Sequence, residues 1–492
     1  MTQAEKQGQL PYPFDLSALE QLNHCNRCGF CLPSCPTYVL LAREPASPRG
    51  RLAMAEEVLE GRLALDRHVG EQMFLCLGCR ACESACPSGV VFSRVLEAVR
   101  AAVEARAAWT PQAAPVRRML LDHLVTHPAR MRLAAALLWA YRSSGMSALA
   151  RRLGLLRRLP WHLGELEPMV PDLPPPWRWP RPGRRPLARR EGRGRLQARA
   201  VGGSAGANPG HGRLEGVDGG RPPAGEAALF AGCIMDAFFP KTQQATVRVL
   251  EALGVRVAVA YGQGCCGALH AHAGRLEEAR ALARRNIEAF EGLADSWVVN
   301  NAGGCGAMLK EYPLLFEQEP AWRRRAEAFS RRVRDISELL VELGAVEALR
   351  RREKPAGRPS ESGSPGRPVR VTYQDSCHLR HGQKLFAPPR QLLCALPGYE
   401  FVEMPDADRC CGSAGIYTLT HFDISMQLLD ARMQQVLRTG AQVVATANPG
   451  CFMQMRLGVA RAGLSGQIRV AHVVDLVAEA LSGPEPGVQG AR

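Results

Sequence analysis

The chain has 492 residues, of which 46% are hydrophobic and 22% charged, as in ordinary globular proteins with several domains. No apolar run reaches the roughly 18 residues that a transmembrane helix needs, so we expect none. The net charge is +15, but 11 arginines lie between Arg178 and Arg221 against three acidic residues. This basicity belongs to one segment without the aromatic pattern of a base-stacking surface, which excludes nucleic acid as an expected partner.

The chain contains 17 cysteines, a number that would suggest disulfides only in a small secreted domain. The N-terminal segment MTQAEKQGQLPYPFDL has no basic stretch followed by an apolar core, so we expect no signal peptide. A reducing cytoplasm, where thiolates bind metals, fits this composition better. We therefore expect a cytoplasmic protein and leave open a peripheral attachment to the inner face of the cell membrane.

Two cysteine runs with identical spacing lie near the N-terminus. The first contains Cys25, Cys28, Cys31 and Cys35, and the second contains Cys76, Cys79, Cys82 and Cys86. Both have the spacing of two-cluster ferredoxins, in which the fourth cysteine of each run ligates the cluster of the other. The predicted [4Fe-4S] ligand sets are Cys25, Cys28, Cys31 and Cys86 for one cluster, and Cys35, Cys76, Cys79 and Cys82 for the other. Zinc agrees poorly with two complete runs.

Helical patterns flank both runs and predict an α-helical ferredoxin-like domain over residues 16–101. We expect helices at Arg51–Asp66 and Phe92–Ala108. Residues 102–168 should form a helical connector rich in arginine and leucine. Its positive faces are either simply solvated or bind a membrane surface.

Two segments rich in Pro, Arg and Gly divide the rest of the chain. Residues 169–225 and 351–368 have no periodicity and too little apolar surface to order themselves, so we predict disordered linkers there. They delimit two domains, residues 226–350 and 369–483, in which strand and helix patterns alternate. This alternation predicts α/β domains with parallel sheets and right-handed crossovers.

The two α/β domains are copies of one another. The first carries Cys233, Cys265, Cys266 and Cys305, and the second carries Cys377, Cys410, Cys411 and Cys451. Equivalent cysteines are separated by between 144 residues (Cys233 to Cys377) and 146 residues (Cys305 to Cys451), which indicates a duplication. Each follows the carboxyl end of a predicted strand, where open α/β sheets bind ligands. We therefore expect four thiols to converge in each copy.

Each copy contains a Cys-Cys-Gly element, whose glycine permits the sharp turn that adjacent cysteines need to reach one point. Four convergent thiols suit an iron–sulfur cluster or zinc, and a redox-active disulfide is a third interpretation. A scaffold with purely structural metal sites is a further alternative for the whole chain. The two N-terminal runs argue against that alternative.

The order of the modules resembles the iron–sulfur subunit of glycolate oxidase. The strings that carry this resemblance are Cys266-Gly-Ala-Leu-His270, Asn301-Ala-Gly-Gly-Cys305, Ser376-Cys377-His378-Leu-Arg-His381 and Asn448-Pro-Gly-Cys451. The Cys-Cys-Gly domain is also similar to the Cys-Cys-Gly subunit of heterodisulfide reductase, lactate-utilisation proteins and the small subunit of anaerobic glycerol-3-phosphate dehydrogenase. Where the heterodisulfide reductase subunit has a further cluster-binding thiol, this chain has Met308 and Gln454.

The resemblance implies an electron-transfer subunit of a glycolate, or more generally 2-hydroxy-acid, oxidase or dehydrogenase complex. No flavin fingerprint is present, so substrate oxidation is expected on a partner subunit that contains FAD, and no catalytic residue is expected here. The acceptor implied by the family is a quinone or the membrane electron-transport chain. The alternative is a heterodisulfide-reductase-like or anaerobic glycerol-3-phosphate dehydrogenase-type subunit.

Other residues near the thiols have two interpretations. Four histidines either ligate metal, move protons and bond to sulfur, or are ordinary polar residues. They are His270, His272, His378 and His381. Arg49 and Arg51 either shield cluster charge or stabilise a turn. Cys394 has no counterpart in the first copy and is expected to be buried in an apolar helix.

Overall fold

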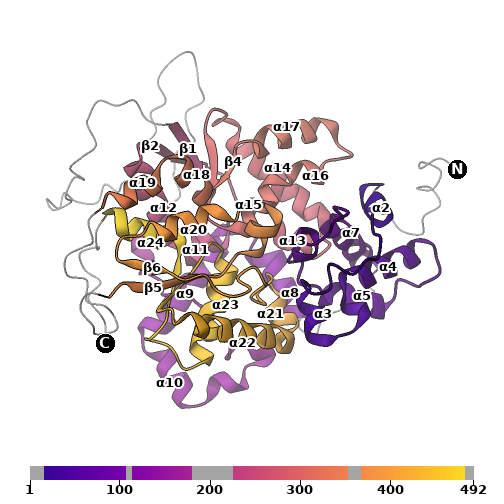
Figure 1. Cartoon of the computed structure of the whole chain (residues 1–492), viewed down its shortest axis with the longest axis horizontal. Coiled ribbons are helices and arrows are strands. Elements are labelled where there is room, and N and C mark those ends of the chain that lie inside the picture. The colour runs from indigo at the N-terminus through magenta and orange to yellow at the C-terminus, as the bar shows by residue number, and fades with distance from the viewer. Residues whose placement is uncertain (1–15, 107–113, 180–224, 353–366, 483–492) are drawn as a thin grey trace.

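The computed structural model describes residues 16–106, 114–179, 225–352 and 367–482. Figure 1 shows the N-terminal module (indigo) at one end, beside the two α/β copies. The connector (magenta) runs along the lower side of the two copies in this view. Among the described residues, no helix is long and apolar enough to cross a membrane.

The N-terminal module consists of short helices and the loops between them. They are α2 (Leu16–Asn23), α3 (Pro36–Leu41), α4 (Pro48–Leu59), α5 (Arg67–Leu75), α6 (Ala81–Ser84) and α7 (Phe92–Ala105). The helix predicted at Arg51–Asp66 ends earlier because the chain turns at Gly61 with φ +74°. Asp66 instead begins α5, since its carboxylate accepts hydrogen bonds from the backbone amides of His68 (2.9 Å) and Val69 (3.1 Å).

The connector contains α8 (Ala114–Arg118), α9 (Pro128–Ser143) and α10 (Met146–Arg152). The structure differs from the prediction over residues 169–179, which the sequence assigned to a disordered linker. Met169 and Trp179 are buried, and the Trp179 indole donates to the carbonyl of Pro174 at 2.8 Å. The remaining residues of the predicted linkers, except at their edges, lie outside the described residues.

Each α/β copy is built on a four-stranded parallel sheet. The first has the order β2-β1-β3-β4, with β1 (Gly225–Leu229), β2 (Val255–Val259), β3 (Trp297–Asn300) and β4 (Val333–Asp335). The second has the order β6-β5-β7-β8, with β5 (Val369–Tyr373), β6 (Tyr399–Phe401), β7 (Val443–Thr446) and β8 (Arg469–His472). The identical orders confirm the predicted parallel sheets and the duplication.

Helices connect the strands in both copies. The first copy contains α11 (Ile234–Phe238), α12 (Pro240–Ala252), α13 (Ala268–His272), α14 (Leu276–Glu291), α15 (Gly303–Lys310), α16 (Tyr312–Leu315), α17 (Pro320–Ser330), α18 (Ile336–Glu342) and α19 (Ala345–Arg350). The second contains α20 (Ala387–Cys394), α21 (Tyr417–Thr420), α22 (Phe422–Thr439), α23 (Pro449–Arg461) and α24 (Val473–Ser482). Cys394 is exposed rather than buried as expected, because Leu392 and Leu393 occupy the inward positions of α20.

One hydrophobic core lies between the two sheets and belongs to both copies. It includes Leu250 of α12 and Leu339 of α18 from the first copy, and Leu393 of α20 and Val477 of α24 from the second. Helix α12 packs directly on α24, on the left side of Figure 1. Each copy alone would expose this apolar face to water, so the two copies stabilise one another.

His472 joins the two copies beside this core. Its ring is completely buried, Nε2 donates to the carbonyl of Asn301 at 2.8 Å, and Nδ1 accepts from the amide of Val474 at 3.2 Å. Only the neutral ring can make both bonds. Burial accordingly lowers the pKa of His472 to about 4, from an ordinary value of 6.5.

We expect the contact made by His472 to weaken in acid. The unfolded chain takes up the proton as pH falls through 6.5, whereas the folded protein resists it until about 4, so stability present above pH 6.5 is lost in this window. His472→Gln should lower the free energy of unfolding at neutral pH by about 1–2 kcal/mol. The difference in melting temperature between wild type and variant should shrink as pH falls from 6.5 toward 4. A constant difference would show that His472 does not titrate with unfolding.

Candidate functional site

The two N-terminal cysteine runs share one backbone conformation. In each run the second and the fourth residue after the first cysteine have positive φ: Arg27 (52°) and Gly29 (89°), then Gly78 (63°) and Arg80 (64°). These left-handed residues curl each run into a loop. In the second loop, the backbone amide of Gly78 also donates to the sulfur of Cys76 at 3.4 Å.

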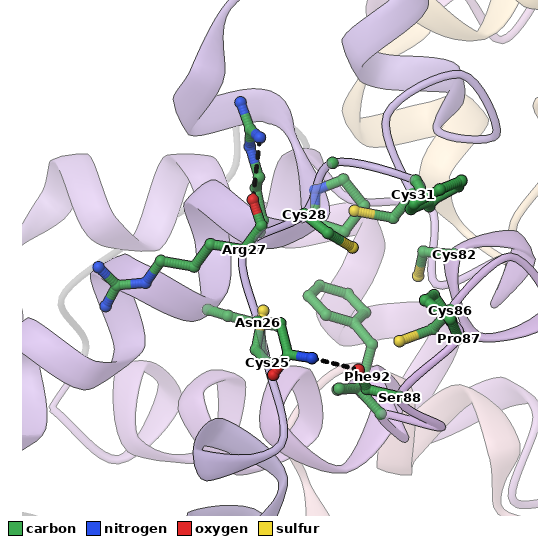
Figure 2. A pocket seen from close by; sticks show the side chains of 16 residues that line it. Cys25, Asn26, Arg27, Cys28, Cys31, Cys82, Cys86, Pro87, Ser88 and Phe92 are labelled. Atoms are coloured by element: carbon green, nitrogen blue, oxygen red, sulfur yellow. Dashed lines mark hydrogen bonds between the residues drawn. The ribbon is translucent and has the colours of Figure 1, made fainter.

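The first run faces a hollow, shown in Figure 2. Its cysteine lining is Cys25, Cys28, Cys31, Cys82 and Cys86. The four cysteines of the first predicted ligand set therefore come together from two runs that are far apart in the sequence. A hydrogen bond of 3.0 Å from the Asn26 amide to the Ser88 hydroxyl joins the runs at this hollow. Cys28 is exposed and the neighbouring Phe30 is 67% exposed, so this hollow lies at the surface.

The second run faces a smaller hollow in the interior, lined mainly by buried residues. Its cysteine lining is Cys35, Cys76, Cys79 and Cys82, which is the second predicted ligand set. Cys82 lines both hollows, whereas Cys35 lines only this one and Cys86 only the first. This arrangement agrees with the exchange of the fourth cysteine between runs, and ligation itself stays a prediction.

Two buried arginines without an acidic hydrogen-bond partner lie at the second hollow, whereas a third arginine in its lining, Arg80, is ion-paired with Glu83 and Glu311. Arg51 lines it, is 1% exposed, and donates to the carbonyls of Gln72 (2.7 Å) and Ala46 (2.8 Å). Arg100 is 5% exposed and donates to the carbonyl of Cys76 at 2.6 Å. The hydrogen-bond partners described for both guanidinium groups are neutral, and a buried cation with neutral partners is costly unless negative charge lies near. An anionic thiolate cluster in this hollow would supply that charge.

The residues present thus fit [4Fe-4S] clusters by donor chemistry and by charge. Burial raises the pKa of the thiols of Cys79 and Cys82 well above the ordinary value of 9.0. Without a bound cation these side chains would therefore remain protonated at neutral pH. Iron binding would release their protons, so cluster binding and thiolate formation are coupled.

The four thiols of each α/β copy also come together, as expected. In the first copy, the sulfurs of Cys233 and Cys265 lie 3.6 Å apart, and Cys266 lies within hydrogen-bond reach of both Cys265 and Cys305. In the second copy, neighbouring thiols lie within reach of one another in the order Cys377, Cys410, Cys411 and Cys451. The proximity of the Cys410 thiol lowers the pKa of Cys377 well below 9.0.

The Cys-Cys-Gly turns have the conformation that the sequence predicted. Gly267 and Gly412 have φ of +89° and +91°, and a Cβ on Gly412 would lie only 2.8 Å from the carbonyl oxygen of Ser425. Met308 is buried in the core, and Gln454 donates to the Ser425 hydroxyl at 3.0 Å. In the described part of the chain, no group of three or more Cys, His, Asp or Glu side chains is arranged to hold a single metal ion. The contents of these two sites therefore stay a prediction.

The four histidines lie where the modules meet. His270 bonds through Nε2 to the carbonyl of Leu121 in the connector (3.1 Å), and its buried Nδ1 has no hydrogen-bond partner among the described residues. His378 lies 3.5 Å from the Cys377 sulfur. His272 and His381 contact the N-terminal module instead. They bond to Glu97 of α7 at 2.7 Å and to Ser84 of α6 at 2.9 Å.

The two copies have different neighbours. Leu77 and Cys79 of the second run pack with Cys377, Cys410 and Tyr417 of the second copy in one buried cluster. The Tyr417 hydroxyl donates to the carbonyl of Leu75 at 2.9 Å, which fixes this contact. The interior hollow of the N-terminal module therefore borders directly on the thiols of the second copy.

The thiols of the first copy are covered by the connector. Leu121 and Met131 of the connector, together with Trp179, pack against Cys233 and Cys265. Sequence reasoning missed this cover, and also Arg100 and Tyr417. No local pattern marks these residues, because their partners lie more than 20 residues away in the chain.

Comparison with known families agrees with this organisation. Residues 21–90 match the 4Fe-4S dicluster domain, and residues 227–310 and 371–456 match the cysteine-rich domain. Residues 113–170 match the linker region of the glycolate oxidase iron-sulfur subunit. The chain is 40% identical over 461 residues to the probable glycolate oxidase iron-sulfur subunit of Bacillus subtilis, a match that covers 94% of both chains.

The chain belongs to the glycolate oxidase iron–sulfur subunit family. The subunit of Escherichia coli is 31% identical over 95% of this chain and 96% of its own length. Lactate utilization protein A of Exiguobacterium is 31% identical over 51% of this chain and 96% of its own length. Membership in the glycolate oxidase family supports iron–sulfur clusters and an electron-transfer role within an oxidoreductase complex.

The exchange of ligands between the two runs of this glycolate oxidase family member can be tested with cysteine variants. Cys86→Ser should alter the same electron paramagnetic resonance signal as Cys25→Ser, and Cys35→Ser the same signal as Cys76→Ser. Each variant should lose up to about four of about eight iron atoms in the anaerobically purified protein. Cys394→Ser, on the exposed side of α20, is the control. If Cys86→Ser instead altered the signal affected by Cys76→Ser, each run would hold its own cluster.

Proposed function

We propose that this subunit relays electrons from an FAD-containing subunit, which oxidises glycolate, to a quinone or another acceptor at the membrane. The observation that carries the proposal is the serial arrangement of the cysteine sites. One hollow lies at the surface of the N-terminal module, the next lies inside it, and the second hollow borders on the thiols of the second α/β copy. Such an order suits stepwise transfer through the protein.

When bound, [4Fe-4S] clusters take up and release single electrons. The chain's own residues would hold and tune them. Arg51 and Arg100 bring two buried positive charges to the interior site, which favours its reduced, more negative state. Leu77 and Tyr417 exclude water between the interior hollow and the second copy, so little solvent has to reorganise there when charge moves.

The exposed hollow is the proposed entry point for electrons. Cys28 and Phe30 are both exposed, and Arg27 beside them is ion-paired with Glu56 at 2.5 Å. An exposed aromatic ring next to a redox site is the kind of residue that becomes buried in a protein interface. A flavoprotein docked here would approach the first site more closely than any other.

Reduction of the clusters by the flavoprotein tests the proposed relay. The subunit is purified anaerobically together with its flavoprotein partner, and glycolate is added. We expect cluster absorbance to bleach and reduced-cluster resonance signals to appear, with no change when the subunit receives glycolate alone. Thiol–disulfide turnover by the isolated subunit, without reduction by the flavoprotein, would contradict the relay and support the heterodisulfide-reductase-like alternative.

Phe30→Asp should slow this reduction because a charge replaces the apolar ring at the proposed interface. We expect a rate at least about tenfold lower at subsaturating flavoprotein, while iron content stays unchanged. Tyr261→Asp is the matched control, since Tyr261 is 65% exposed but lies on the first α/β copy. An equal effect of the two substitutions would mean that Phe30 is not part of the entry face.

A further inference from the structure

Exposed apolar side chains gather on the connector. Among the described residues, 16 large hydrophobic side chains are exposed, and eight of these lie within residues 133–163. They are Leu133, Leu137, Met146, Leu149, Leu153, Leu155, Leu159 and Leu163, which we call the connector face. The other eight are spread over the rest of the described chain, so this concentration is a property of the connector.

Helix geometry places these side chains in stripes. On α9, Leu133 and Leu137 are one turn apart and 60% and 62% exposed, whereas Met131 and Ala135 face inward. On α10, Met146 and Leu149 are followed by Leu153 at its end, spaced by three and four residues. Helix α10 packs on α9 and lies at the lower edge of the molecule in Figure 1, away from the N-terminal module.

Positive charge borders the stripes. Residues 128–165 contain seven arginines and a single acidic residue, Glu165. Arg130 lies on the outward side of α9, and Arg151 and Arg152 are exposed on α10, where Arg151 also pairs with Glu167 at 3.2 Å. Two other arginines turn inward to ion pairs within the protein: Arg132 with Asp236 at 2.7 Å and Arg142 with Glu167 at 3.5 Å. The outer side thus combines leucine with arginine and almost no negative charge.

The combination of exposed leucine and arginine indicates which kind of partner the connector face binds. A second copy would bring the same positive charge to the interface, which repels. A helix whose outward side carries leucine flanked by arginine is typical of binding in the plane of a membrane surface, where arginine meets lipid phosphates and leucine enters the acyl boundary. The short α9 and α10 suit a position on the surface rather than across it.

We propose that the connector face binds the surface of an anionic phospholipid bilayer. Its buried side covers Cys233 and Cys265, so the same segment would hold the first α/β copy against the membrane. The role of this binding in electron transfer rests on the proposed relay to a membrane acceptor. Lipid binding itself is independent of electron transfer and is measured separately.

Vesicle co-sedimentation tests the proposal on the full chain, purified anaerobically with its iron retained. The vesicles consist of phosphatidylcholine alone or of phosphatidylcholine mixed with phosphatidylglycerol. We expect binding to the mixed vesicles that decreases with added salt, and little binding to phosphatidylcholine alone. The combined variant Leu133→Ser, Leu137→Ser, Leu149→Ser and Leu153→Ser should reduce the bound fraction by about tenfold.

Matched variants distinguish binding through the connector face from nonspecific adsorption of the protein to vesicles. Leu314→Ser with Leu437→Ser removes leucines that are 41% and 52% exposed on the two α/β copies, and should leave binding unchanged. Arg130→Gln, Arg151→Gln and Arg152→Gln together should remove the preference for phosphatidylglycerol. Unchanged iron content and absorbance show that each variant is folded.

Three results would overturn the proposal. The first is no binding to either vesicle, and the second is binding that the leucine variant retains. The third is that the wild type does not bind lipid, while the leucine variant loses flavoprotein capture or self-association. That result would show that the connector face binds a protein. Reduction of the clusters by glycolate and the flavoprotein in lipid-free solution should be equal in wild type and leucine variant. A failure of that reaction in wild type would contradict the relay and leave the vesicle result intact.

Discussion

Sixteen of the 17 cysteines are gathered into four groups, and the crowding of their sulfur atoms constrains the rest of the structure. Closely spaced thiolates repel one another, and burial disfavours their charged form further. The raised pKa values of Cys79 and Cys82 express this cost. Bound iron would offset the cost of burying these thiolates. The left-handed loop residues, the strand ends and the buried arginines are all arranged around these groups.

The duplication produced two similar sheets in unlike surroundings. The thiols of the second copy border on the N-terminal module through Leu77 and Cys79, whereas those of the first copy are closed off by the connector. His472 and the shared core hold the two copies in a fixed relation, so this difference persists in the folded protein. Two sites that are equivalent in sequence are therefore expected to differ in accessibility to electrons and solvent.

The connector acts on two sides. Its inner side packs Leu121 and Met131 on the thiols of the first copy, and its outer side presents leucine and arginine to the surroundings. The linker-region match over residues 113–170 falls on this segment, which shows that it is a defined part of this family. A single helical segment thus couples a cysteine site to the proposed membrane surface.

The sequence by itself determined the local features. Cysteine spacing identified both ferredoxin-like runs, the offset between copies identified the duplication, and strand–helix alternation predicted both parallel sheets. These features depend on neighbours along the chain, which a single sequence records. The short strands β4 and β8 were not predicted. The helix predicted over Arg51–Asp66 was too long, because Asp66 caps the next helix instead of continuing the first.

Only the tertiary structure decided which thiols face which module, that Arg100 lies beside Cys76, and that Cys394 points outward. It also decided that α9 and α10 leave their leucines uncovered. These outcomes depend on packing between segments separated by tens to hundreds of residues. Burial and long-range contact energies are set by the whole chain at once, so no local pattern encodes them.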